Sequence, residues 1–95
     1  MNELRFTWDS DKNDTNIVKH GIDFQRVALV FKGEIVERID DRRDYGELRM
    51  IALGQLNLTV YRVVYTEPEQ GLIRIISAQK AERHEQEIYY RALYA

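Results

Sequence analysis

Hydrophobic and polar positions follow two different periods along this chain of 95 residues, and the change of period separates predicted helices from predicted strands. Residues 4–8 alternate between apolar and polar side chains, which predicts a short strand. Asp9 follows as a favourable N-cap, and Gly21 is a typical residue just beyond a helix end, so a helix is predicted to run up to His20. Its residues are mostly polar, which indicates a helix on the surface.

A second helix begins after Asp23, again a good N-cap residue, and Gly33 ends it. Four apolar residues recur in it at i, i+3, i+4 and i+7. They form one stripe that faces a core: Phe24, Val27, Ala28 and Phe31.

From residue 34 onward the period becomes two, which predicts strands. The charged segment 40–46 is predicted to be a loop, residues 54–57 a tight connection and residues 67–71 a turn. Val60, Val63 and Val64, with the isoleucines of the last strand, predict that the last two strands lie at the centre of the sheet. The predicted strands are 34–39, 48–54, 58–66 and 72–78.

The final helix is predicted to open at Ser77 or Gln79 and to carry Ala81, Ile88 and Tyr89. The connections between the long strands are too short for crossovers, so these strands form an antiparallel meander. Residues 1–95 are therefore predicted to be a single α+β domain, in which a β-meander sheet packs with two N-terminal helices and one C-terminal helix.

Composition narrows the functional class. Charged residues make up 32% of the chain and apolar residues 44%, which is typical of a globular protein. The chain has no cysteine, so a cysteine-based zinc site is excluded and a secreted, disulfide-stabilised domain is disfavoured. No apolar run approaches the length of a membrane span and the start does not resemble a signal peptide. These features predict a cytoplasmic protein that needs no cofactor.

The net charge is −2, whereas a nucleic-acid-binding protein is expected to be basic. Any RNA site must therefore be a local cluster of basic side chains. RNA cleavage by its own 2′-hydroxyl needs a base, an acid and fixed positive charge, and it needs no metal. The two histidines, fourteen Lys/Arg and six tyrosines of this chain suit that chemistry.

His20 is the predicted acid–base group, because an imidazole titrates near neutral pH. A histidine that only stabilises a helix end by its charge is the alternative. His84, among charged neighbours on the last helix, is interpreted as part of a solvated face. The proposed catalytic and RNA-binding residues are His20, Arg49, Lys80 and Arg83 for catalysis, with Arg74, Tyr65 and Ser77 for RNA binding.

Each of these residues also has a structural interpretation. Lys80 and Arg83 are three apart on the predicted helix and share a face, but surface ion pairs with nearby glutamates are equally open to them. Tyr65 can stack on a base or pack across strands. Ser77 is more simply a helix N-cap. The carboxylates of loop 40–47 would suit Mg²⁺, although the interleaved arginines favour a solvated loop.

Three stretches together resemble the BrnT family, the toxins of BrnT–BrnA toxin–antitoxin modules. They are Phe6-Thr7-Trp8-Asp9 with Lys19-His20-Gly21-Ile22-Asp23-Phe24; Asp44-Tyr45-Gly46-Glu47-Leu48-Arg49; and Val63-Val64-Tyr65-Thr66 with Arg74-Ile75-Ile76-Ser77-Ala78. The resemblance implies a RelE-like fold and a ribonuclease that stops translation. It also implies a BrnA-like ribbon-helix-helix antitoxin, through which the complex binds operator DNA. Gln79 stands where the family usually has arginine, which removes one candidate phosphate contact.

Three functional hypotheses follow. The first is a metal-independent endoribonuclease toxin, held in a heteromeric complex by its antitoxin. The second is a non-catalytic module that acts only within a repressor complex with that antitoxin. The third is a small metal-dependent nuclease that uses the acidic loop. Four aromatic residues that a small core need not cover are candidate anchors for the partner: Trp8, Tyr45, Tyr90 and Tyr94.

Overall fold

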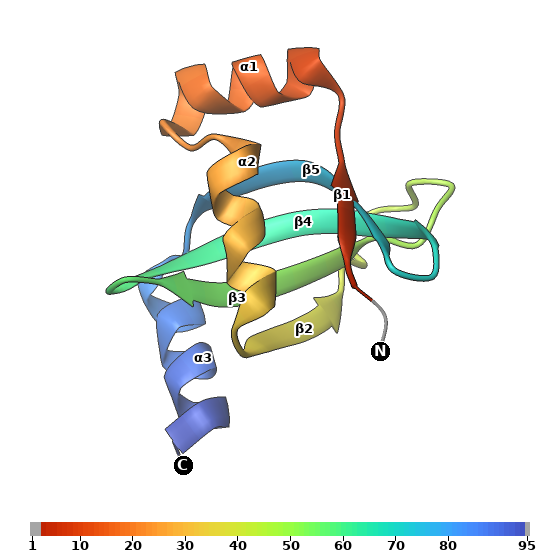
Figure 1. Cartoon of the computed structure of the whole chain (residues 1–95). Helices are drawn as coiled ribbons and strands as arrows, with labels where there is room; N and C mark the ends of the chain where they lie inside the picture. Colours follow the sequence, from red (N-terminus) through yellow and green to blue (C-terminus); the bar gives the residue numbers. More distant parts are fainter. Residues whose placement is uncertain (1–2, 95) are drawn as a thin grey trace.

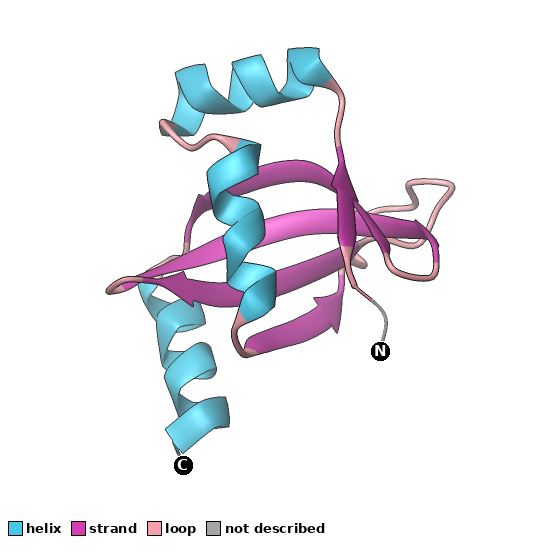
Figure 2. Ribbon diagram, in the orientation of Figure 1, coloured by secondary structure: helices cyan, strands magenta, loops and turns pink. Residues whose placement is uncertain are grey.

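A computed structural model of the chain describes residues 3–94 and shows a five-stranded sheet with helices on both faces (Figure 1; Figure 2). The order of elements matches the order that the sequence predicts, β-α-α-β-β-β-β-α, with a short 3-10 segment continuing the second helix. The elements are β1 (Arg5–Thr7), α1 (Ser10–His20), α2 (Phe24–Val27), the 3-10 helix η1 (Ala28–Lys32), β2 (Ile35–Ile39), β3 (Met50–Leu56), β4 (Thr59–Glu69), β5 (Leu72–Lys80) and α3 (Arg83–Tyr94).

The strand order in the sheet is β1-β5-β4-β3-β2. Strands β2 to β5 form the predicted antiparallel meander, and β4 is the central strand. The short strand β1 adds to the outer side of β5 in parallel, so the sheet is mixed. Parallel pairing is possible there because the chain leaves β1 through two helices before it returns to the sheet.

The caps of the first two helices are those that the sequence predicts. The Asp9 carboxylate accepts hydrogen bonds from the N–H groups of Asp11 and Lys12, and Gly21 closes α1 in a left-handed conformation with φ of 70°. The Asp23 side chain caps α2 in the same way, by accepting from the N–H of Gln25. These two caps fix the sharp change of direction between α1 and α2.

The main core lies between the sheet and the α2–η1 segment, which crosses over the strands in Figure 1. Phe24 and Val27 are fully buried against the sheet residues Val63, Ile73 and Ile75. This confirms the apolar stripe that the sequence predicts. A second, smaller core packs α3 against the opposite face of the sheet, where Tyr89 and Ala81 join Leu53 and Val60.

Strand β3 begins two residues later than predicted, and β4 continues to Glu69 through most of the predicted turn at 67–71. Two further boundaries that the sequence predicts are wrong. The β3–β4 turn lies at residues 57–58, where Asn57 has a φ of 55°, and the predicted connection at 54–57 is mostly strand. Gly54 is inside β3 because Val30 packs onto it: a Cβ at this position would lie 2.7 Å from the Val30 Cβ. The glycine therefore marks a close approach between layers and not a turn.

The second error concerns the end of the sheet. Strand β5 continues to Lys80 and α3 begins at Arg83, so Ser77 is a strand residue and not a helix N-cap. Ala81 lies in the connection and its N–H donates to the carbonyl of Val60. The first turn of α3 is stabilised by Glu85, whose carboxylate accepts the N–H of Glu82, as in half of a capping box.

Candidate nucleic-acid interface

The sheet face opposite α2 and η1 carries a row of arginines from three different strands. In the strand register, Arg38 of β2 lies beside Ile51, which pairs with Val64 of β4. Arg62 is two residues before Val64 and shares its face, and Arg74 of β5 pairs with Thr66 on the same side. Because α3 covers only one end of this face, the arginines are partly exposed. We call this surface the arginine face.

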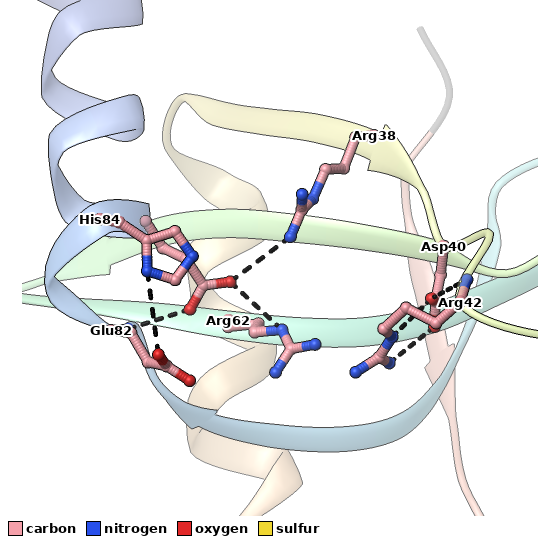
Figure 3. Close-up of polar contacts among 7 residues, drawn as sticks. Arg38, Asp40, Arg42, Arg62, Glu82 and His84 are labelled. Carbon is pink, nitrogen blue, oxygen red and sulfur yellow. Dashed lines mark hydrogen bonds and ion pairs between the residues drawn. The ribbon is translucent and has the colours of Figure 1, made fainter.

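A buried carboxylate on α3 holds two of these arginines. Glu85 is only 3% exposed at its side chain, and its Oε2 lies 3.3 Å from Nε of Arg62 and 3.6 Å from Arg38 (Figure 3). The Arg62 side chain is 14% exposed, and its buried Nε makes no hydrogen bond of good geometry within residues 3–94. One carboxylate thus faces two guanidinium groups, which leaves excess positive charge at this end of the face.

A second buried carboxylate fixes the loop between β2 and β3. Both Asp40 oxygens accept hydrogen bonds from the Arg42 guanidinium, at 2.7 and 2.8 Å, and the Asp40 N–H donates to the carbonyl of Arg49. The bond from Arg42, more than any other factor, holds the pKa of the Asp40 carboxyl well below its usual range. The same pair raises the pKa of Arg42. Figure 3 shows the Asp40–Arg42 pair by its dashed lines.

The loop between β2 and β3 carries a further basic residue of this surface, Arg49. Glu47 accepts hydrogen bonds from Arg49 at 3.1 Å and from Arg74 at 2.8 Å, so one carboxylate joins the loop to β5. These bonds lower the pKa of Glu47, with the hydrogen bond from Arg49 as the largest cause. The Arg49 guanidinium also lies 4.1 Å from the centre of the Tyr45 ring. The guanidinium is therefore held in place on two sides.

Two adjoining cavities extend this surface toward α1. One, of about 390 Å³, is lined by Arg49, Arg74 and Lys12 together with Trp8. The other, of about 320 Å³, lies between α1 and β5 and is lined by residues that include Lys12, Lys19, His20 and Ser77. Lys12 and Ile76 line both cavities, so the two adjoin each other beside α1 and are given one name as a groove. We call it the α1 groove.

Polar side chains attach α1 to the sheet. Asn16 is 4% exposed; its amide donates to the carbonyl of Ile22 at 2.9 Å, and its oxygen accepts the N–H of Ala78 at 3.0 Å. Asn13 accepts the N–H of Phe24 and donates to Asp23. A mostly polar helix is thereby fixed over the edge of β5, with its basic residues along the groove.

The structure brings together four of the seven predicted site residues. His20 and Ser77 line one cavity of the α1 groove, and Arg49 and Arg74 line the other. Lys80 and Arg83 line neither, and they do not share a helix face, because Lys80 is in a strand.

The other three predicted site residues, Lys80, Arg83 and Tyr65, lie outside the groove. Lys80 pairs with Tyr61, so its side chain leaves the sheet on the side opposite the arginine face. The Arg83 side chain is 95% exposed and approaches only Glu87, at 3.7 Å. Tyr65 is 2% exposed, its ring packs edge-on against Phe31 and its hydroxyl bonds to Glu37. Its ring packs against η1 and has almost no exposed surface for stacking on a base.

Sequence reasoning missed five basic residues of this surface. Lys12 and Lys19 are at i and i+7 and share a helix face with Asn16, a spacing that is visible in the sequence. The spacing of two between Val60, Arg62 and Val64 likewise places Arg62 on the same strand face as these valines. The missed residues are Lys12, Lys19, Arg38, Arg42 and Arg62.

The four aromatic residues predicted as anchors have different surroundings. Trp8 is partly buried and packs edge-on against Phe24 at 6.1 Å, so it closes the core edge. Tyr45 lies beneath arginines of the loop. Tyr90 receives a hydrogen bond from Gln55 and stacks on Tyr94, which is exposed.

The acidic loop is not arranged as a metal site. Asp40 and Glu47 are already bonded to arginines, and residues 3–94 hold no group of three or more His, Asp or Glu side chains placed to bind a metal ion. Among the helices that the structure describes, none is long and apolar enough to cross a bilayer.

Comparison with known proteins shows the family of this chain. Residues 8–85 match the family described as "Ribonuclease toxin, BrnT, of type II toxin-antitoxin system". The chain thus belongs to the BrnT family, a family of ribonuclease toxins of type II toxin–antitoxin systems.

Among solved structures, the crystal structure of the Brucella abortus ribonuclease toxin BrnT is similar. The TM-score is 0.62 at 25% sequence identity, and the match covers 84% of this chain and 99% of that one. No curated protein matches the sequence.

The anchor of the β2–β3 loop gives a pH-dependent prediction. Because the folded-state pKa of Asp40 is lowered, its ion pair stabilises the fold above the ordinary carboxyl pKa, and this stability is lost as the pH falls through the lowered value. We expect Asp40→Asn to reduce the free energy of unfolding by about 1–3 kcal/mol at pH 7. The difference from the unmodified protein should shrink below about pH 4, as measured by urea unfolding across pH.

Asp41→Asn is the matched control, since Asp41 is an exposed neighbour, and it should change stability by less than about 0.5 kcal/mol. A deficit in Asp40→Asn that stays constant from pH 7 to pH 3 would show that its charge does not stabilise the loop.

Proposed function

We propose that this protein is a metal-independent endoribonuclease toxin of RelE-like fold, which inhibits translation in the cytoplasm and is neutralised by a BrnA-like ribbon-helix-helix antitoxin. Operator DNA is bound only through that antitoxin. The observation that carries the proposal is the gathering of basic side chains on the arginine face and in the α1 groove, in a protein whose net charge is −2. On the arginine face and the β2–β3 loop, Asp40, Glu47 and Glu85 are each paired with arginine, whereas Asp9 and Asp11 also line the α1 groove.

The groove would supply fixed positive charge and one proton-transfer group for cleavage by the neighbouring 2′-hydroxyl. Arg49, Arg74 and Lys12 line one cavity, where fixed positive charge would stabilise the phosphorane. His20 and Ser77 line the adjoining cavity, where His20 would transfer the proton. The Glu47 carboxylate holds both arginines before substrate arrives, and this preorganisation is what makes electrostatic stabilisation effective.

The arginine face extends the binding surface beyond the reacting phosphate. Arg62, Arg42 and Arg38 would contact successive phosphates of a single strand. Gln79 pairs with Arg62 across β4 and β5, so an arginine in its place would extend the same row of charge. Its absence predicts weaker phosphate binding than in family members that carry the arginine.

The first prediction concerns the chemistry. The purified protein should cleave single-stranded RNA in excess EDTA and leave 2′,3′-cyclic phosphate ends, because the nucleophile is the adjacent hydroxyl and the charges come from side chains. End-group analysis by mass spectrometry reads the products. Activity that is lost with EDTA and restored by Mg²⁺ would instead favour a metal-dependent nuclease. RNA binding without cleavage would favour the non-catalytic repressor module.

The second prediction locates the site. Arg49→Ala and Arg74→Ala should each reduce kcat by roughly 10- to 1,000-fold, the range for removal of one preorganised charge. Their melting temperatures should change little, because these ion pairs are partly exposed. His20→Ala should reduce activity and remove the limb of the pH–rate profile near neutrality.

Lys80→Ala and Arg83→Ala are the controls, since both side chains lie outside the groove. They remove the same charge and should retain activity within about threefold, an effect of well under 1 kcal/mol. If they abolish cleavage while Arg49→Ala and Arg74→Ala retain it, the site lies at the start of α3 and the groove assignment is wrong.

A further inference from the structure

The two edges of the sheet differ in what pairs with their outer backbone groups. At one edge, β1 pairs with β5, and beyond β1 the side chain of Asn16 accepts the N–H of Ala78 in place of another strand. At the other edge, β2 pairs only with β3, and the described part of the chain places no strand on its outer side. Proteins usually block such an edge, because its free backbone groups can pair with another chain.

The register shows which backbone groups of β2 are free. The Asp40 N–H donates to the carbonyl of Arg49, so residue 40 bonds toward β3. In an antiparallel ladder, residues alternate between bonding to the partner strand and pointing away from it. The N–H and C=O groups of Ile35, Glu37 and Ile39 therefore point away from β3. They offer three donors and three acceptors along one line.

Apolar side chains flank this edge on both faces of the sheet. On one face, Ile39 is 58% exposed and Leu48 is 65% exposed. On the other, a hollow of about 190 Å³ is lined by Val36, Leu53 and Ile88, with Arg38 and Glu85 at its polar side. An added strand would cover these groups as it formed its backbone hydrogen bonds.

We propose that the β2 edge binds an extended, basic segment of the antitoxin, which adds to the sheet as a sixth strand next to β2. This inference rests on the proposed function, which supplies the partner. The charge of the edge indicates the chemistry of the segment: Glu34 precedes the strand, and Glu37 and Glu67 line a hollow of about 440 Å³ beside Leu48. A lysine or arginine of the segment opposite Glu37 would pair with its carboxylate. An apolar residue toward Leu48 would cover that exposed side chain.

A second copy of this chain fits the edge poorly. Two-fold antiparallel pairing centred on β2 would place Glu37 directly opposite the same residue of the other copy, and like charges at that position are destabilising. A basic segment would instead place a positive charge opposite Glu37. From the edge, the segment meets the arginine face at Arg38, so a continuation of the partner chain over that face would block RNA.

The test uses the protein encoded by the adjacent reading frame as the partner, with the dissociation constant measured by calorimetry. Ile39→Pro removes one outward N–H and leaves the bonds between β2 and β3 intact, which is where an edge strand tolerates proline. Ile39→Ala is the matched control, because it shortens the side chain and keeps the N–H. We expect Ile39→Pro to weaken binding at least 10-fold relative to Ile39→Ala, while the free variant still melts cooperatively and cleaves RNA.

Hydrogen exchange on the unmodified proteins provides a second measurement that does not depend on folding of the proline variant. The amides of Ile35, Glu37 and Ile39 should exchange more slowly in the complex than in the free toxin. Equal affinities of the proline and alanine variants, or unchanged exchange at these amides, would overturn the proposal. So would protection of the same amides in the free toxin at high concentration with a dimer on gel filtration, which would make a second copy the occupant.

The same experiments separate this inference from the function on which it rests. If the unmodified toxin does not bind the neighbouring protein, the partner assignment and the edge proposal both fail. If the toxin binds and the β2 amides become protected but RNA is not cleaved, the nuclease assignment fails and the edge proposal stands.

Discussion

The arrangement of this protein depends on one buried amide, the side chain of Asn16. Helix α1 has too few apolar residues to be held by hydrophobic packing alone, and Asn16 joins it at once to the α1–α2 connection and to β5. A buried amide that loses such partners costs about 1–3 kcal/mol for each unsatisfied group, so the helix position is well specified. That position places Lys12, Lys19 and His20 opposite β5, and without it the α1 groove would not exist.

The same principle recurs across the arginine face, where the buried carboxylates of Asp40 and Glu85 and the exposed carboxylate of Glu47 hold arginines in place. Glu85, Asp40 and Glu47 belong to α3 and to the β2–β3 loop, and each of them contacts one or two guanidinium groups. Buried ion pairs are poor sources of net stability, because the desolvation of both charges offsets their attraction. Their value here is positional: they orient a row of positive charge on a protein whose total charge is negative. An acidic protein can thereby present a local surface suited to a phosphate backbone.

Much of the fold was predictable because it depends on local signals. Asp9, Gly21 and Asp23 set the helix ends through their own side chains or backbone freedom, and the stripe from Phe24 to Phe31 marked the core. The errors occurred where a distant contact decides the outcome. Gly54 looked like a turn residue, but Val30 packs on it; Ser77 looked like a helix cap, but pairing with Val64 extends the strand through it. Of the predicted site residues, His20, Ser77, Arg49 and Arg74 line the α1 groove, whereas Lys80 lies in a strand and not on the predicted helix as a result of that same strand extension.

The central claim is that RNA lies in the α1 groove and along the arginine face. The most direct test is an NMR titration of the ¹⁵N-labelled protein with a short 2′-O-methyl oligoribonucleotide, which binds as RNA does but lacks the attacking hydroxyl. We expect the signals that shift to be the amides of Lys12 and Ser77 and the side-chain Nε–H groups of Arg49, Arg62 and Arg74, with shifts that weaken as salt rises. Shifts confined to the α2–η1 side of the sheet, with these signals unchanged, would contradict the account.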